Sequence, residues 1–183
     1  MYFPEARIIQ APISQEQVLD LEAGQWVRLF GAVILARDTT HQKLVEDLAK
    51  EIDPPVPLAG SVIYYAGPTP VPPYRVVGSI GPTTAQRMDR FLPFFFGQGV
   101  RATIGKGERS REAFELHQRY RAIYFLACGG AAAYLSRFIT ACELLAYPEL
   151  GTQALRRVHL AGLPVLVAYD ARGGNIFHYA VKT

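Results

Sequence analysis

Residues 100–127 read VRATIGKGERSREAFELHQRYRAIYFLA, and their pattern is the clearest indication of the fold class. The segment 100–104 is short and apolar, as in a buried strand, and the glycine-rich turn 105–107 follows it. Ser110 is a residue type that caps helices, so a helix is expected after it, and a second apolar strand is expected over 122–127. A strand, a helix and a strand in this order predict an α/β fold.

Strands and helices also alternate on both sides of this unit. The other expected strands are apolar and bounded by glycine or proline, and they lie at 26–36, with Gly31 as a candidate break, and at 61–65, 75–80, 164–169 and 175–181. The other expected helices lie at 38–50, from the Thr83-Thr84 turn to about Pro93, at 131–138 and just after Pro148. Both kinds of element occur throughout, so we expect an α/β domain with a mixed sheet.

Composition limits the class of protein. The 183 residues, 50% of them hydrophobic, predict one domain over 1–183 that needs no disulfide or metal to fold. The net charge of +3 is not concentrated in a basic helix or lysine block, which argues against nucleic acid. No long apolar run or signal peptide is recognisable, so no membrane association and a cytoplasmic location are expected. Fifteen of the 19 cations are arginines, whose planar fork suits carboxylates and phosphates.

Three short motifs could bind a small anion. Thr83 and Thr84 open a predicted helix whose free backbone N–H groups and hydroxyl caps would form an anion site, and Arg87 follows four residues later. Lys106 stands between two glycines, where its ammonium could reach a ligand that approaches the backbone. Arg37 follows an apolar strand, and its neighbour Asp38 is a candidate cap of the next helix. If Asp38 caps that helix, Arg37 is free to face a cleft at the end of the sheet. A capped helix, an ordinary turn and a surface arginine remain the alternatives.

The cysteines and histidines do not form a recognisable metal site. Cys128 and Cys142 are fourteen residues apart, and the four histidines, at 41, 117, 159 and 178, include no HxxxH pair. His41 is expected at the surface, and Cys128 is expected to be a small buried thiol. The chain is therefore expected to bind no metal by itself.

Seven blocks of sequence, taken in order, resemble the β subunit or C-terminal half of class I fumarate hydratases and of L-tartrate dehydratases. The blocks are GAVILARDTTH (31–41), VIYYAGPTP (62–70), GSIGPTTAQRMD (78–89), IGKGERS (104–110), GGAAA (129–133), AYPELG (146–151) and the turn before Asn175. Gln86 and Gln25 depart from the family's usual glycine and aspartate. The stretch AYPELGTQAL is more similar to fumarases than to tartrate dehydratases.

The resemblance implies a swivelling domain of the β/β/α type that closes over a partner. In the family that partner is an α subunit. The resemblance implies a heterotetramer of two α and two β chains. The α subunit would carry a four-iron, four-sulfur (4Fe-4S) cluster on three cysteines, with one iron open to act as a Lewis acid. The two cysteines of this chain agree with a cluster held elsewhere.

The resemblance also assigns roles to the candidate residues. Arg37, Arg87 and Lys106 would bind the dicarboxylate substrate, and Thr83 would transfer the proton next to a carboxylate. A threonine hydroxyl is a weak acid, so cations must lower its pKa if it is to act as a base. The implied reaction is the reversible hydration of fumarate to (S)-malate. The alternatives are an L-tartrate dehydratase β subunit and a non-catalytic anion-binding module.

Overall fold

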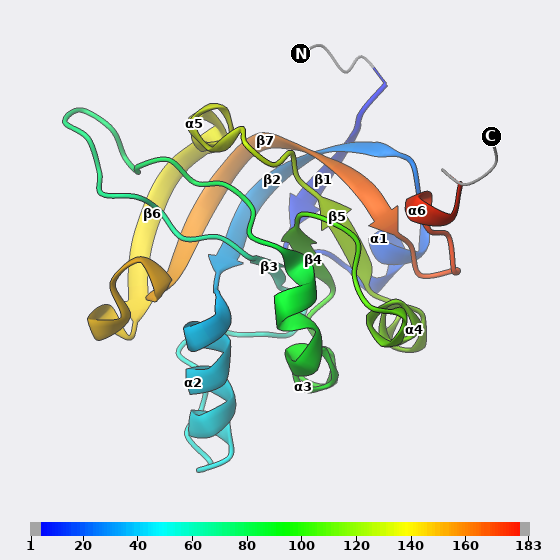
Figure 1. Cartoon of the computed structure of the whole chain (residues 1–183), viewed down its shortest axis with the longest axis horizontal. Coiled ribbons are helices and arrows are strands. Elements are labelled where there is room, and N and C mark those ends of the chain that lie inside the picture. Colours follow the sequence, from blue (N-terminus) through cyan, green and yellow to red (C-terminus); the bar gives the residue numbers. More distant parts are fainter. Residues whose placement is uncertain (1–4, 180–183) are drawn as a thin grey trace.

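A seven-stranded mixed sheet organises the protein, for which a computed structural model describes residues 5–179 (Figure 1). Its strands are β1 (Arg7–Ala11), β2 (Trp26–Leu35), β3 (Val62–Tyr64), β4 (Ala102–Gly105), β5 (Ile123–Leu126), β6 (Ile139–Ala146) and β7 (Leu155–Tyr169). Neighbouring strands from β1 to β5 are parallel. β7 is antiparallel to β2, β5 and β6. The predicted α/β fold with a mixed sheet is confirmed.

The two longest strands close the sheet on itself. β7 pairs with β2 along almost the whole of β2, and its last residues also pair with β5. The parallel series from β2 to β5 is thereby joined at both ends to β7, which gives a barrel-like arrangement. β1 and β6 extend the sheet beyond this ring. The carboxyl ends of β2, β3 and β4 point the same way because these strands are parallel.

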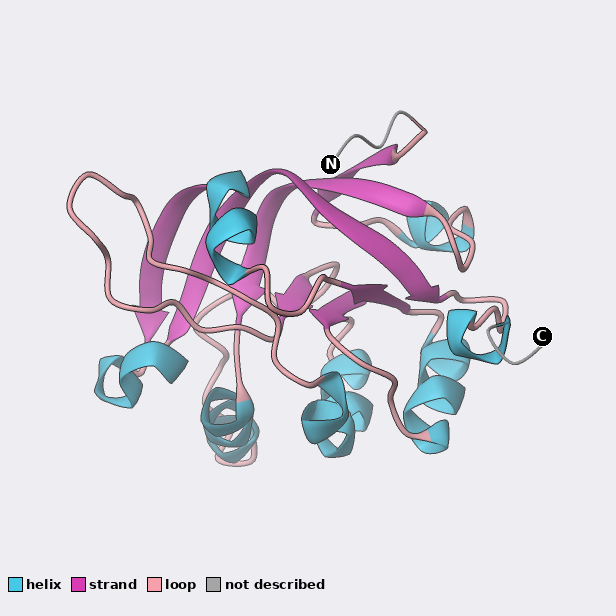
Figure 2. Ribbon diagram, turned by 45° about the horizontal axis from the view of Figure 1, so that its top comes forward, coloured by secondary structure: helices cyan, strands magenta, loops and turns pink. Residues whose placement is uncertain are grey.

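Helices cover the sheet mainly on one side, as the row of coils beneath the strands in Figure 2 shows. The α-helices are α1 (Gln15–Leu19), α2 (Asp38–Leu48), α3 (Leu92–Gly97), α4 (Arg111–Tyr120), α5 (Ala132–Leu135) and α6 (Ile176–Tyr179), and the 3₁₀ helices are η1 (Ala85–Phe91), η2 (Ser136–Phe138) and η3 (Pro148–Gln153). None of the helices between residues 5 and 179 is long and apolar enough to cross a bilayer.

Two hydrophobic clusters form the core, one on each face of the curved sheet. In β3, Val62 and Tyr64 belong to the inner cluster and Ile63 to the outer one, because successive side chains of a strand point to opposite faces. Leu44 of α2 and Phe95 of α3 pack into the outer cluster. The helices are therefore held against the sheet next to the strand ends that carry the site.

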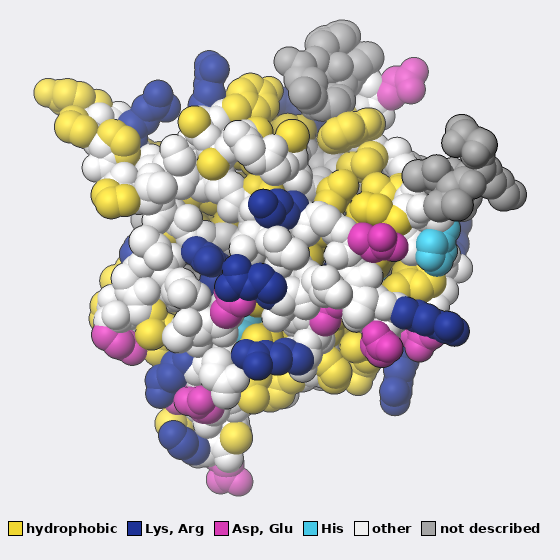
Figure 3. All heavy atoms as spheres, viewed as in Figure 1, with side chains coloured by type: hydrophobic (Ala, Val, Ile, Leu, Met, Phe, Trp, Pro, Cys, Tyr) yellow, Lys and Arg dark blue, Asp and Glu magenta, His cyan; other side chains and the backbone are white. Residues whose placement is uncertain are grey.

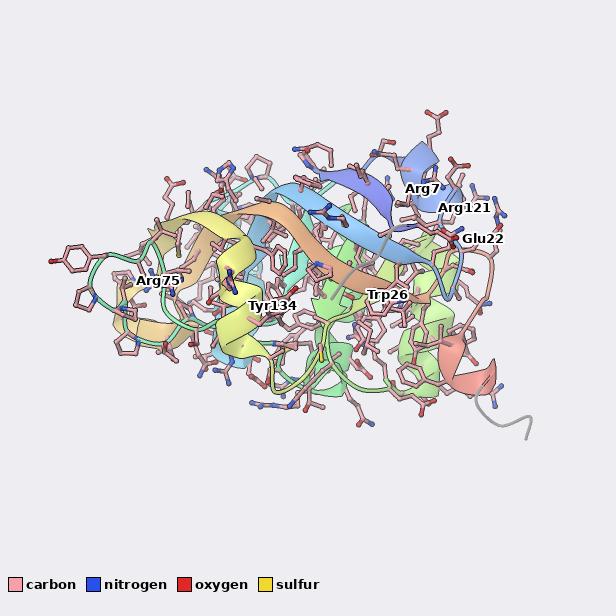
Figure 4. The ribbon with its side chains drawn as sticks, turned by 90° about the horizontal axis from the view of Figure 1, so that it is seen from above. Arg7, Glu22, Trp26, Arg75, Arg121 and Tyr134 are labelled. Atoms are coloured by element: carbon pink, nitrogen blue, oxygen red, sulfur yellow. The ribbon has the colours of Figure 1, made fainter. Side chains whose placement is uncertain are left out.

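One predicted strand is wrong, because residues 66–80 form a long arm that leaves the sheet. Thr69 N donates to Ser79 O at 3.1 Å, and the Thr69 hydroxyl accepts from Ser79 N at 2.9 Å, which closes the arm near its base. Arg75, which opens the predicted strand 75–80, lies on the projecting part, far from Arg7 and Arg121 (Figure 4). β-branched residues favour a strand, but no neighbouring strand is available to pair with this segment in the described structure.

A second correction concerns the strand expected at 175–181. Asn175 Oδ1 accepts from Phe177 N at 2.9 Å, and α6 begins directly after Asn175. An asparagine side chain that binds backbone N–H groups in this way favours a helix start over an extended chain. Residues 180–181 of the expected strand lie outside the described residues.

The strand expected at 164–169 is the end of a much longer strand, β7. Pro164 lies inside β7 but in a stretch paired with β2 alone, since β6 pairs with residues 155–160 and β5 with residues 166–169. A proline, which has no N–H group, is tolerated in a strand where one side has no neighbouring strand. β1, α1 and β6 were not predicted, and Gly31 does not break β2 but takes a positive φ of 90° against the backbone of Ala11.

Candidate functional site

A polar cavity of about 310 Å³ lies where three parallel strands end. Arg37 follows β2, the Ala66-Gly67 pair follows β3, and Lys106 follows β4. The cavity is completed by Gly81, Pro82, Thr83, Thr84 and Arg87. All four candidate residues from the sequence, Thr83, Arg37, Arg87 and Lys106, thus line one cavity, although the sequence separates them by up to 69 positions. Figure 3, drawn in the view of Figure 1, shows Lys and Arg side chains gathered near the centre of the face turned toward the reader.

Backbone hydrogen bonds hold the Thr83 turn against the Lys106 turn. Lys106 N donates to Thr83 O at 3.0 Å, and Ala85 N donates to Lys106 O at 3.0 Å. Thr83 N donates to Tyr65 O at 2.8 Å. These N–H groups are therefore used within the protein, and the expectation that the turn offers free N–H groups to an anion is wrong for Thr83 and Ala85.

The threonine hydroxyls do not cap the helix that follows them. η1 is a seven-residue 3₁₀ helix whose N-cap is Thr84, and the Thr84 side chain makes no capping hydrogen bond. Thr84 is exposed, whereas Thr83 is half-buried in the cavity wall. The Thr83 hydroxyl lies 3.5 Å from Arg87 Nη1. The predicted hydroxyl caps are thus wrong, and the Thr83 hydroxyl faces a cation.

Asp38 holds the guanidinium of Arg87, a contact that sequence reasoning missed. Arg87 Nε donates to Asp38 Oδ1 at 2.9 Å, and Arg87 Nη2 lies 2.8 Å from Asp38 Oδ2. Asp38 was expected to cap α2, but α2 begins at Asp38 itself, and Arg37 is its N-cap without a side-chain bond. A two-pronged contact of this kind fixes both the position and the plane of the fork.

Arg37 is half-buried, and its Nε is enclosed without a hydrogen-bond partner. Its carbonyl oxygen accepts from the ring of His41, whose Nδ1 lies 2.7 Å away. His41 was expected at the surface, but it is buried among the rings of Tyr65, Phe91 and Phe95. This burial lowers the pKa of His41 to about 4, so the ring is neutral and donates to the carbonyl.

The structure corrects the expected location of one of the two cysteines. Cys128 is exposed, contrary to the expected buried thiol, and Cys142 is half-buried. In the described part of the chain, no three His, Cys, Asp or Glu side chains come together in a way that could hold a metal ion. These residues therefore do not fit an iron–sulfur cluster, which needs several thiolate ligands.

An α/β domain with a cationic pocket at the carboxyl ends of its parallel strands is a form in which anionic ligands are commonly bound. The chain belongs to the fumarase C-terminus family, which residues 5–180 match.

Three relatives illustrate the family. The chain is 33% identical over 173 residues to fumarate hydratase 2 of Leishmania major, and this alignment covers 92% of the chain and 30% of the relative. It is 35% identical over 158 residues to the anaerobic class I fumarate hydratase of Escherichia coli strain K12, covering 84% of the chain and 28% of the relative. It is 32% identical over 176 residues to a putative L(+)-tartrate dehydratase subunit beta of Methanocaldococcus jannaschii, covering 93% of the chain and 90% of the relative.

The chain therefore spans about 30% of the length of the two fumarate hydratases and most of the tartrate dehydratase subunit.

Proposed function

We propose that this domain is the β subunit of an iron–sulfur-dependent hydro-lyase that hydrates fumarate to (S)-malate. The observation that carries the proposal is the convergence of Arg37, Arg87, Lys106 and Thr83 on one cavity of about 310 Å³. Membership of a family whose relatives are named fumarate hydratases supports it. The whole chain, 1–183, is proposed to act as this single domain.

Charge balance supports a dicarboxylate as the ligand. Three cations line the cavity, and Asp38 pairs with Arg87, so the formal charge of these four side chains is about +2, which matches a dianion. A carboxylate that leaves water needs fixed positive partners to offset its lost hydration. The enclosed Nε of Arg37 has no hydrogen-bond partner within the protein.

In the proposed reaction, Thr83 moves the proton. During dehydration of malate, a proton leaves the carbon next to a carboxylate and the hydroxyl leaves the neighbouring carbon. Thr83 Oγ1 accepts that proton, and in hydration it returns the proton to the same carbon. Arg87, 3.5 Å from this oxygen, favours the deprotonated hydroxyl, and the cations stabilise the charge that builds up on the carboxylate.

The 4Fe-4S cluster is proposed to lie on an α subunit, because the described residues of this chain do not provide its ligands. When bound there, it would supply a Lewis acid for the departing hydroxyl. The proposed assembly is a heterotetramer of two α and two β chains. The two unpaired cysteines of this chain suit the reducing cytoplasm, which is the proposed location.

The tartrate dehydratase subunit, matched over 90% of its length, favours L-tartrate as the second candidate substrate. It would use the same cations and the same proton transfer. A non-catalytic anion-binding module is the remaining alternative, in which the pocket binds a dicarboxylate without turnover.

Anaerobic co-expression with the α subunit tests the proposal. The purified complex should hydrate fumarate faster than it dehydrates L-tartrate, while this chain alone should hold no iron or sulfide and show no turnover. Faster turnover of tartrate would shift the proposal to the second substrate. Stoichiometric iron in the isolated chain, or a complex inactive on both substrates, would contradict it.

A further inference from the structure

A buried ion pair joins the two segments that carry the cavity residues. The side chain of Arg109 is 0% exposed and that of Asp89 13% exposed. Arg109 Nε donates to Asp89 Oδ1 at 2.7 Å, and Nη2 lies 2.7 Å from the same oxygen. Neither residue lines the anion cavity. The pair therefore does not touch the substrate proposed above.

The two residues of the pair lie close in sequence to two of the cavity residues. Asp89 belongs to η1, two residues after Arg87, and Arg109 follows Lys106 by three residues. Asp89 Oδ2 also accepts from Ser110 N at 2.9 Å. One carboxylate thus ties the helix that carries Arg87 to the turn that carries Lys106.

Two tyrosine rings lie next to the guanidinium of Arg109. Its Cζ lies 5.3 Å from the ring centres of both Tyr65 and Tyr124. Nη1 donates to the hydroxyl of Thr103 at 3.1 Å. The hydroxyl of Tyr124 donates to Gly107 O at 2.7 Å, which adds another contact to the Lys106 turn. Hydrogen bonds and two neighbouring rings therefore hold the fork of Arg109 in place.

Burial of two charges is an expensive way to stabilise a fold. An apolar pair of similar volume is often as stable, whereas loss of one charge alone leaves its partner buried and uncompensated. A buried ion pair can serve geometry instead, because its two charges favour the one arrangement of the joined segments that keeps them paired.

We propose that Asp89 and Arg109 are positioning residues that set the ammonium of Lys106 relative to Thr83 and Arg87. The proposal rests on the proposed function for its effect on turnover, but the geometry it describes can be measured without turnover.

The first measurement follows Lys106 directly in the full chain. Reductive ¹³C-methylation labels all four lysines, and Lys106→Arg identifies the Lys106 signal by NMR. Asp89→Leu/Arg109→Met removes both charges together, and Arg109→Lys keeps the charge but loses the fork. Both variants should shift or broaden the Lys106 signal and leave those of Lys43 and Lys50, on α2 and beyond its end, in place. An unchanged Lys106 signal in either folded variant would overturn the proposal.

The second measurement is a double-mutant cycle in the complete enzyme. Either variant should lower kcat/KM for fumarate by about tenfold or more, since small misplacements of binding groups cost this much. In a Lys106→Ala background the same change should have little further effect, because its target is gone. Arg111→Lys is the matched control. Arg111 lies two residues after Arg109, at the start of α4, and its side chain is 87% exposed, so this variant should leave kcat/KM unchanged.

The outcomes separate a positioning role from a structural one. A full, independent loss in the Lys106→Ala background would contradict positioning and indicate general destabilisation, as would a fall in melting temperature that accounts for the lost activity. If the wild-type complex is inactive on fumarate and tartrate, the proposed function fails, and the Lys106 signal decides the positioning proposal by itself.

Discussion

Replacement of Arg87 by lysine keeps the positive charge of the cavity and removes the planar fork. In the structure, Arg87 uses Nε and Nη2 on Asp38 and directs Nη1 toward Thr83. One N–H group on each terminal nitrogen then remains for a substrate carboxylate. A lysine has a single nitrogen, which cannot hold Asp38 and present two parallel donors at the same time.

The magnitude follows from the bonds that are lost. One hydrogen bond to a charged group contributes about 1.5–3 kcal/mol. That range corresponds to roughly a 10- to 150-fold fall in kcat/KM, at about 1.4 kcal/mol for each factor of ten. The fall should appear in kcat as well as KM, because charge on the carboxylate is greatest in the transition state.

Steady-state hydration of fumarate by the complete enzyme is the assay, and Arg90→Lys is the control. Arg90 lies on the same helix, η1, and its guanidinium stacks 4.5 Å from the ring centre of Phe91. Arg90→Lys should behave as wild type. An Arg87→Lys enzyme within about threefold of wild type would refute the role of the fork and return Arg87 to a surface charge.

Two further predictions concern stability and packing. Burial lowers the pKa of His41 to about 4 and that of His117 to about 3, so the unfolded chain binds more protons below pH 6.5. Protonation of these two histidines below pH 6.5 favours the unfolded state, so the folded protein loses stability as pH falls. The free energy of unfolding from urea titrations should drop by about 4 kcal/mol from pH 7 to pH 5. Gly67→Ala should weaken dicarboxylate binding, measured by calorimetry, because the new methyl group would collide with Thr152 O and meet Arg37 Cδ at 3.2 Å.

Matched variants check both. His117→Phe should roughly halve the pH dependence of stability, and an unchanged slope would mean that the histidines are not its source. Gly97→Ala meets no atom within 4 Å, so it should bind dicarboxylate as wild type does. Equal losses in the two glycine variants would remove the argument from close packing.

The parts of the fold that sequence predicted are those with strong local signals. The strand, turn and helix around Ser110 follow local preferences, and Ser110 does cap α4 through a bond from Ala113 N at 3.1 Å. β6 was missed because its pairing with β7 is non-local and its burial is low. The arm at 66–80 was misjudged for the opposite reason, since its β-branched residues found no strand to pair with.

In the candidate site, too, local signals predicted the residues but not the contacts between distant parts of the chain. The identity of Arg37, Thr83, Arg87 and Lys106 came from motifs and resemblance, but their meeting at one cavity depends on the parallel order of β2, β3 and β4. Asp38 was assigned to a local cap because the sequence places it at a helix start. Its true partner is 49 positions away, a contact that no local rule could supply.

The proposed reaction depends on proton transfer by the Thr83 hydroxyl, which a comparison of three variants can test. In the complete enzyme, kcat for fumarate hydration and Kd for the dicarboxylate are measured for Thr83→Ala, Thr83→Ser and the adjacent control Thr84→Ala. Thr83→Ala should lose several orders of magnitude in kcat with nearly unchanged Kd, Thr83→Ser should retain part of the activity, and Thr84→Ala should resemble wild type. A Thr83→Ala enzyme with near-normal kcat, or a Thr84→Ala enzyme equally impaired, would contradict it and place the proton acceptor elsewhere.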